Sequence, residues 1–134
     1  MTWDDYSEKE LVAILKSMIF VMATDNGLSD RAKNYLNRKA VLIDCTVPLL
    51  KKTTEISPLE TVEIIRNMSF DKKDIIPYLW IESAAINHGR TYGEYCFDDF
   101  EYEKEAVLVL SERCNVDISN YLSNRHEIHP PLTL

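Results

Sequence analysis

Residues 7–23 read SEKELVAILKSMIFVMA, and this stretch decides the fold class. Ser7 followed three residues later by Glu10 is a capping box, which predicts that a helix begins here. Apolar residues then recur at the three- and four-residue spacing of one helical face. From Met18 to Ala23 the stretch is apolar nearly all round, so we expect this half of the helix to lie in the centre of the core.

Two further serine caps divide the first half of the chain. Gly27 is expected to end the first helix, and Ser29 is expected to cap a second one. Ser57 stands before Pro58 and Glu60, which combines an N-cap, a proline at the first helical position and a returning glutamate. The positions of this helix that are predicted to face inward are Leu59, Val62, Ile65 and Met68.

The helical pattern continues in the second half of the chain. A helix is predicted from Asp71 toward Asn87, and Pro77 either kinks this helix or marks its real start. No segment alternates between apolar and polar residues as a half-buried strand does. The predicted fold class is therefore all-α, a compact bundle of about seven helices.

The last two of these helices are predicted after a loop. Residues 88–97 have neither the helical nor the strand period, so we expect a loop there. Asp98 or Asp99 is predicted to cap a helix that ends at Cys114, and Asp117 to cap a short final helix.

Composition limits the class of protein. The chain has 134 residues, a formal net charge of −7 and three cysteines. We expect one domain over 1–125 and a mobile C-terminal tail over 126–134. The acidic balance argues against nucleic acid as a partner, because affinity for phosphates depends on Lys and Arg.

Cysteine usage and hydropathy predict a cytoplasmic location. Cys45, Cys96 and Cys114 are odd in number and form no close pair, so reduced cysteines are expected. The N-terminus lacks the features of a signal peptide, and the longest strongly apolar run, residues 17–24, is far shorter than the ~20 residues of a membrane span.

A faint internal repeat bears on function. Residues 18–27 and 79–89 each read as an apolar helix that ends in a short polar turn with a glycine, Gly27 or Gly89. Two such helix–turn–helix units can pack with pseudo-two-fold symmetry, which would bring both turns to one end of the bundle. A generic helix C-terminus explains the two segments equally well.

The same turns carry a family resemblance. An apolar helix followed by Ala23-Thr24-Asp25-Asn26-Gly27-Leu28-Ser29-Asp30, with a second copy before residues 101–108, resembles the TerB-like domains of tellurium-resistance and stress-response proteins. The resemblance covers Leu11 to about Leu122. It implies a compact helical module with an acidic surface that binds divalent cations and works in a larger complex near the inner face of the membrane.

The sequence departs from the family pattern at both turns. Leu28 replaces an acid in the first turn, and the second turn has lost both acids. A rebuilt site for a hard cation such as Ca²⁺ would take its oxygen ligands from both turns. The predicted metal ligands are Asp25, Asn26, Asp30, Asp98, Asp99 and Glu101. The alternative interpretation is that the later acids are helix caps and a solvated face.

Residues 92–102 form a second candidate site. Aromatic residues alternate there with acids and there is no lysine, a pattern that suits contact with a basic protein partner. The predicted contact residues are Tyr92, Tyr95, Phe97, Asp98, Asp99 and Tyr102. The open alternative is that the aromatic residues pin this loop to the body of the domain.

Three function hypotheses follow from these features. The first is a non-catalytic TerB-like interaction or stress-response module with weak divalent-cation binding. The second is a small metal-assisted hydrolase that uses Asp25, His88 and the Asp98–Asp99 pair. The third is an acidic inhibitor or immunity-type protein that blocks a basic partner. The histidines at 126 and 129 lack the four-residue spacing of a zinc motif, so we assign them to the tail.

Overall fold

The computed structural model describes residues 3–23, 27–42, 51–89 and 101–119. Within these ranges the chain is helical apart from turns and caps, and its one β-bridge residue is Gly27. The α-helices are α1 (Glu8–Met22), α2 (Asp30–Leu42), α4 (Pro58–Arg66), α5 (Phe70–Lys73), α6 (Ile76–Asn87) and α7 (Glu101–Cys114), and the short 3-10 helices are η1 (Trp3–Asp5) and η2 (Lys52–Thr54). The all-α prediction is confirmed. The count of seven helices and the paired repeat are not confirmed.

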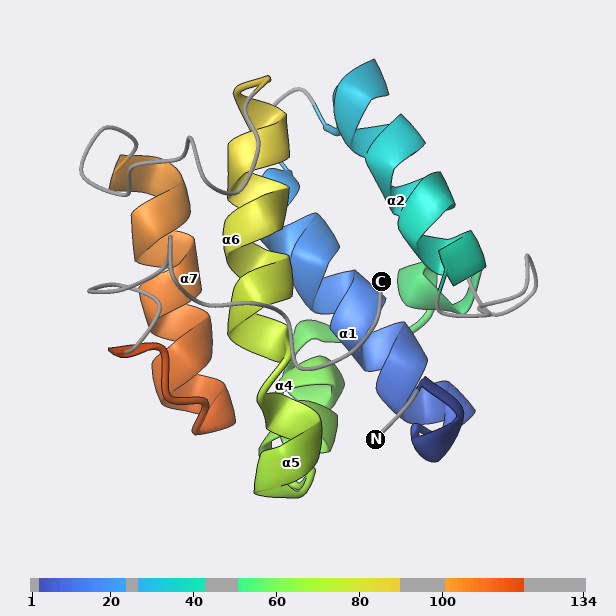
Figure 1. Cartoon of the computed structure of the whole chain (residues 1–134), viewed down its shortest axis with the longest axis vertical. Coiled ribbons are helices and arrows are strands. Elements are labelled where there is room, and N and C mark those ends of the chain that lie inside the picture. The colour runs from blue at the N-terminus through green and yellow to red at the C-terminus, as the bar shows by residue number, and fades with distance from the viewer. Residues whose placement is uncertain (1–2, 24–26, 43–50, 90–100, 120–134) are drawn as a thin grey trace.

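Helix α1 is the centre of the arrangement. It contacts α2, α4, α6 and α7. In Figure 1, α6 lies between α7 and α2, α1 crosses behind α6, and α4 and α5 lie at the lower end. Most residues of α1 are buried, as the apolar character of this stretch predicted.

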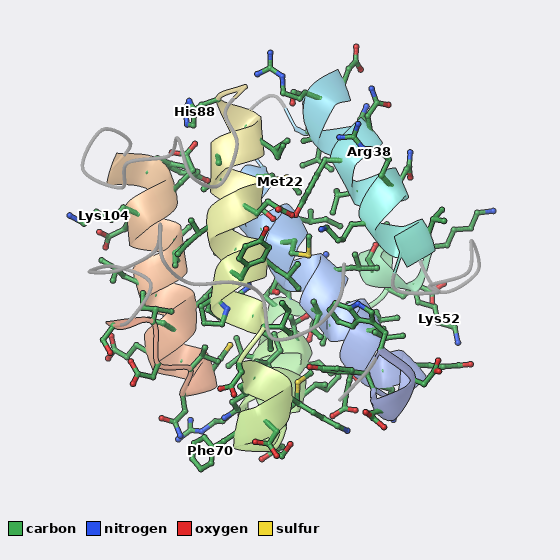
Figure 2. The ribbon with its side chains drawn as sticks, viewed as in Figure 1. Met22, Arg38, Lys52, Phe70, His88 and Lys104 are labelled. Carbon is green, nitrogen blue, oxygen red and sulfur yellow. The ribbon has the colours of Figure 1, made fainter. Side chains whose placement is uncertain are left out.

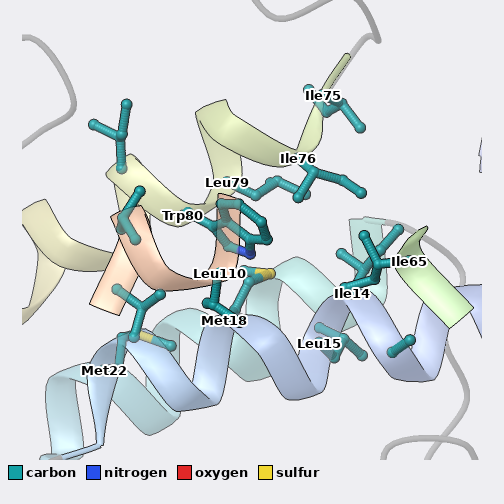
Figure 3. Packing of buried hydrophobic residues seen from close by; sticks show 14 of the residues in the cluster. Ile14, Leu15, Met18, Met22, Ile65, Ile75, Ile76, Leu79, Trp80 and Leu110 are labelled. Atoms are coloured by element: carbon teal, nitrogen blue, oxygen red, sulfur yellow. The ribbon is translucent and has the colours of Figure 1, made fainter. Parts of the chain in front are cut away.

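The contact between α1 and α6 holds the largest buried side chains. Trp80 of α6 is fully buried against α1 near Met18, with Leu110 of α7 beside it (Figure 3). The Trp80 indole N–H donates to the Ser17 hydroxyl at 2.8 Å, and that hydroxyl donates to the Ile14 carbonyl at 2.6 Å. An indole can therefore be buried completely here without leaving its donor unpaired.

The predicted serine caps are confirmed. Ser7 forms the complete capping box with Glu10 at the start of α1. The Ser29 hydroxyl accepts from the Ala32 N–H at 3.1 Å, and the Ser57 hydroxyl accepts from the Glu60 N–H at 3.1 Å. These bonds satisfy backbone donors that the first turn of a helix leaves without a partner.

Two predicted boundaries are settled by backbone geometry. Helix α1 does not extend to Gly27, because Ala23 leaves the helical conformation with φ −68° and ψ 137°. Gly27 instead has a φ of +85° in the connection to α2, a conformation that glycine adopts without a steric penalty. Pro77 lies in the first turn of α6, and α5 is a separate helix before it. Pro77 therefore marks the real start of the helix and does not kink a longer one.

Two apolar residues that were expected in the core are exposed. Leu59 of α4 is 71% exposed and Phe20 of α1 is 48% exposed. The buried face of α4 runs instead through Thr61 and Ile65, and two residues of helix turn Leu59 by about 200° away from Thr61. The apolar surface of α1 likewise continues past the core to Phe20.

Several predictions fall outside the described residues. These are Cys45, Cys96, the loop over 90–97 and the tail over 126–134. Cys114 is described and is a free, buried cysteine, and burial raises the pKa of its thiol to about 11. None of the helices within the described ranges has the length and hydropathy needed to cross a membrane.

Candidate functional site

A groove of about 520 Å³ lies where α1, α4 and α7 meet. Its lining is mainly apolar, and every lining residue belongs to one of these three helices. The lining residues are Lys16, Ser17, Phe20, Pro58, Leu59, Thr61, Val62, Arg66, Val109, Leu110 and Arg113. Pockets of this volume are within the range that ordinary ligand sites occupy.

Helical spacing places an apolar residue and a basic residue on the same face of each wall. On α1, Lys16 and Phe20 are four residues apart, as are Val109 and Arg113 on α7. Residues four apart are neighbours on a helix surface. On α4, Leu59 and Arg66 are seven residues apart, which is nearly two turns, so they also share a face.

The polar atoms at the floor of the groove are already paired. The buried Ser17 hydroxyl bonds to Ile14 and Trp80, and the Thr61 hydroxyl donates to the Ser57 carbonyl at 2.8 Å. Hydroxyl groups that already have hydrogen-bond partners do not require a polar ligand to satisfy them. The groove therefore offers an apolar floor to whatever occupies it.

The charge of the groove is opposite to that of the whole chain. Lys16, Arg66 and Arg113 contribute three cations to the lining, and none of the lining residues is acidic. None of the three forms an ion pair with a carboxylate elsewhere in the described ranges. In a chain of net charge −7, the lining therefore carries three positive charges and no negative one.

Helices α1 and α6 end side by side. The Asn87 side-chain amide of α6 donates to the Met22 carbonyl of α1 at 3.1 Å, which holds the two helix ends together. His88 caps α6, and its Nε2 lies 2.8 Å from Oε1 of the buried Glu103 on α7. Figure 2 shows His88 at this end of α6 and Phe70 at the opposite end of the molecule.

Most of the predicted site residues lie outside the part of the chain that the structure describes. These are Asp25, Asn26, Tyr92, Tyr95, Phe97, Asp98 and Asp99. Asp30 begins α2 and is exposed. Glu101 begins α7, and its side chain is not among those described. Tyr102 is 61% exposed, and its hydroxyl donates to the Ala23 carbonyl at 3.2 Å.

The metal prediction gains no support from the described residues. In ranges 3–23, 27–42, 51–89 and 101–119, no three His, Cys, Asp or Glu side chains come together in a way that could hold a metal ion. The hydrolase hypothesis uses His88, and the position of this residue at a predicted helix end allows three roles for it, a helix cap, a metal ligand or a base. Its place at the C-cap of α6 and its contact with Glu103 match the helix-cap interpretation.

A second polar cluster joins α2 to α6. Glu82 accepts from the Tyr35 hydroxyl at 2.6 Å and the Tyr78 hydroxyl at 2.9 Å, and the buried Lys39 amine lies 2.9 Å from the same carboxylate. Burial and the neighbouring Glu82 charge raise the pKa of Tyr35 well above its ordinary value. Glu82 is thus bound by three donors, which makes it a link between helices.

A buried lysine has a similar structural role at the end of α7. Lys73 lines a pocket of about 370 Å³, and burial lowers the pKa of its amine. The amine donates to the Asn115 carbonyl at 3.2 Å. Asn115 has a φ of +55°, and the Val116 N–H donates to the Ser111 carbonyl at 2.9 Å, as in a Schellman cap. Lys73 therefore completes the C-terminal cap of α7.

Sequence reasoning did not find the groove. It assigned Leu59 to the core because leucine fits the inward spacing of α4. The available signal was the pairing of a basic and an apolar residue on one face of α1, α4 and α7, outside the core face of each helix. That signal has meaning only once these helices are known to be neighbours.

Comparison of the chain with models of known protein families, with curated proteins and with solved structures found no match. The resemblance to TerB-like domains therefore stays a prediction from the sequence.

Proposed function

We propose that this protein is a non-catalytic interaction module that binds a protein partner in the groove between α1, α4 and α7. The observation that carries the proposal is the exposure of Leu59 and Phe20 at a concave site, 71% and 48% respectively. Contiguous exposed apolar surface rimmed by polar residues is typical of interaction sites. Isolated exposed apolar residues such as Val41 on α2 need no such explanation.

The polar clusters support a binding role over a catalytic one. The cluster around Glu82 and the contact between His88 and Glu103 each join two helices. Lys73 is bound to a helix terminus. Each of these groups has a structural partner that accounts for its position.

The other hypotheses stay predictions. Cation binding at the acidic turns and contact with a basic partner through residues 92–102 depend mainly on side chains outside the described ranges. A TerB-like stress-response role and a cytoplasmic location also rest on the sequence alone. The groove adds a surface that none of these hypotheses contained.

Site-specific photocrosslinking in the cells that express the protein tests the proposal. A benzophenone amino acid is placed at Leu59 and, in a separate variant, at Val41, which is comparably exposed on a helix that does not line the groove. We expect a discrete crosslinked protein from position 59 that is absent from position 41.

The crosslinked protein is then identified, purified and titrated against the chain. The variant Leu59→Ser is expected to weaken binding at least tenfold, because an apolar anchor is replaced by a small polar side chain. Crosslinks that are the same from both positions, or an affinity that Leu59→Ser leaves unchanged, would contradict the proposal.

A further inference from the structure

The partner chemistry can be specified further from the charge of the groove, on the condition that the groove is the binding surface proposed above. Lys16, Arg66 and Arg113 come from three different helices, so positive charge is present on every wall. The remainder of the chain is strongly acidic, because the net charge of −7 includes these three cations. An acidic partner is attracted to the groove, because each of its walls carries a cation and none of its lining residues is acidic.

The floor requires that the partner also has apolar side chains. Phe20 and Leu59 present exposed apolar surface, and the Ser17 and Thr61 hydroxyls are already hydrogen-bonded. A wholly polar acidic segment would cover this surface without gaining the free energy of apolar burial. The partner segment must therefore combine apolar anchors with acidic flanks.

The shape of the groove favours a helical segment. Its walls are helices, and the ranges that the structure describes offer no extended strand edge beside it to which a peptide strand could add. A groove between helices accepts an amphipathic helix, whose apolar residues recur at i, i+3, i+4 and i+7. We infer that the α1–α4–α7 groove binds an amphipathic helix of a partner protein with acidic residues flanking its apolar stripe.

Two designed peptides test the inference on the full chain. Both are fluorescently labelled helices with leucines at i, i+3, i+4 and i+7, and they differ only in having glutamates or lysines at the flanking positions. Binding is measured by fluorescence anisotropy. We expect the acidic peptide to bind at least tenfold more tightly than the basic peptide, and this difference to decrease as salt screens the charges.

Charge reversal in the groove provides the decisive variant. Arg66→Glu combined with Arg113→Glu changes two exposed side chains of the rim. The acidic peptide should lose at least tenfold in affinity, and the basic peptide should gain. The matched control is Lys33→Glu combined with Arg38→Glu, which changes two exposed residues of α2 by the same charge. With this control variant, the acidic peptide should still bind more tightly than the basic peptide.

The possible results separate this inference from the proposed function. Equal binding of the two peptides, tighter binding of the basic peptide, or no binding of either overturns the acidic-helix inference. Binding of the chain to vesicles of phosphatidylcholine and phosphatidylserine is also measured, as a test for a membrane surface. Vesicle binding that depends on Arg66 and Arg113, together with no binding of the acidic peptide, also overturns the inference, in favour of a membrane surface. The crosslinking at Leu59 decides separately whether the groove binds a protein.

Discussion

The two sides of α1 differ in how completely they are covered. On the side that faces α6, Met18 and Trp80 are fully buried. On the side that faces α4 and α7, Phe20 of the same helix is 48% exposed and a groove of about 520 Å³ remains. Both sides are apolar, so hydrophobicity alone does not separate core from binding surface. The difference is that α4 and α7 leave a groove between them beside α1 and that Leu59 of α4 is turned outward there.

The covered side should respond most strongly to truncation. We predict that Trp80→Ala lowers the free energy of unfolding by about 3–5 kcal/mol, because a large buried side chain is lost and a cavity remains. The change also removes the hydrogen bond that the indole donates to Ser17. Urea denaturation monitored by circular dichroism measures the effect, with Val41→Ala as the exposed control. A loss below about 1 kcal/mol would mean that the α1–α6 contact is not packed as described.

The start of α1 is held by polar contacts, so its contribution should depend on pH. The Glu10 carboxylate accepts from the Lys72 amine and from the Ser7 N–H, both at 2.8 Å. Burial acts to raise the pKa of Glu10, but the hydrogen bonds from Lys72 and Ser7 outweigh it and lower the pKa below the ordinary value of 4.5. The stabilisation is therefore present above about pH 4.5 and is lost as the pH falls through the lower pKa of the folded protein.

The variant Glu10→Gln tests this direction of the pH dependence. At pH 7 we expect it to reduce the free energy of unfolding by about 1 kcal/mol, since a capping box and an ion pair are weakened. At pH 3 the wild type and the variant should differ less, because the wild-type carboxylate is then being protonated. Urea titrations at the two pH values measure both differences. Glu8→Gln, an exposed change in the same turn, is the control, and a difference for Glu10→Gln that grows toward pH 3 would refute the assignment.

Local signals were enough to predict most of the helices. The caps at Ser7, Ser29 and Ser57 depend on residues within one turn, and the structure has each of them. The role of Pro77 was limited to two alternatives for the same reason, because proline acts on its own turn. Signals of this kind do not require knowledge of which helices are neighbours.

Contacts between distant segments could not be predicted in the same way. Glu103 meets His88, and Glu82 meets Tyr35 and Lys39, only because particular helices pack side by side. The groove has the same origin, since its three basic residues come from α1, α4 and α7. A period in the sequence shows that a helix has an apolar face, but it does not show how much of that face a neighbouring helix covers.

The exposed apolar residues of the groove should respond least to substitution, and Leu59 of α4 gives the sharpest test. We predict that Leu59→Ser changes the free energy of unfolding by less than about 0.5 kcal/mol, because its side chain is already 71% exposed in the isolated chain. Ile65→Ala on the same helix is the matched contrast, since Ile65 is fully buried and its truncation should cost about 2–5 kcal/mol. Both are measured by urea denaturation of the purified protein.

A loss above about 1 kcal/mol for Leu59→Ser would mean that Leu59 is packed within the chain, and the groove would then be part of the core. If Leu59→Ser has a small effect on the free energy of unfolding and a large effect on partner binding, the groove differs in kind from the buried contact between α1 and α6. Its apolar surface then stabilises a complex without stabilising the fold.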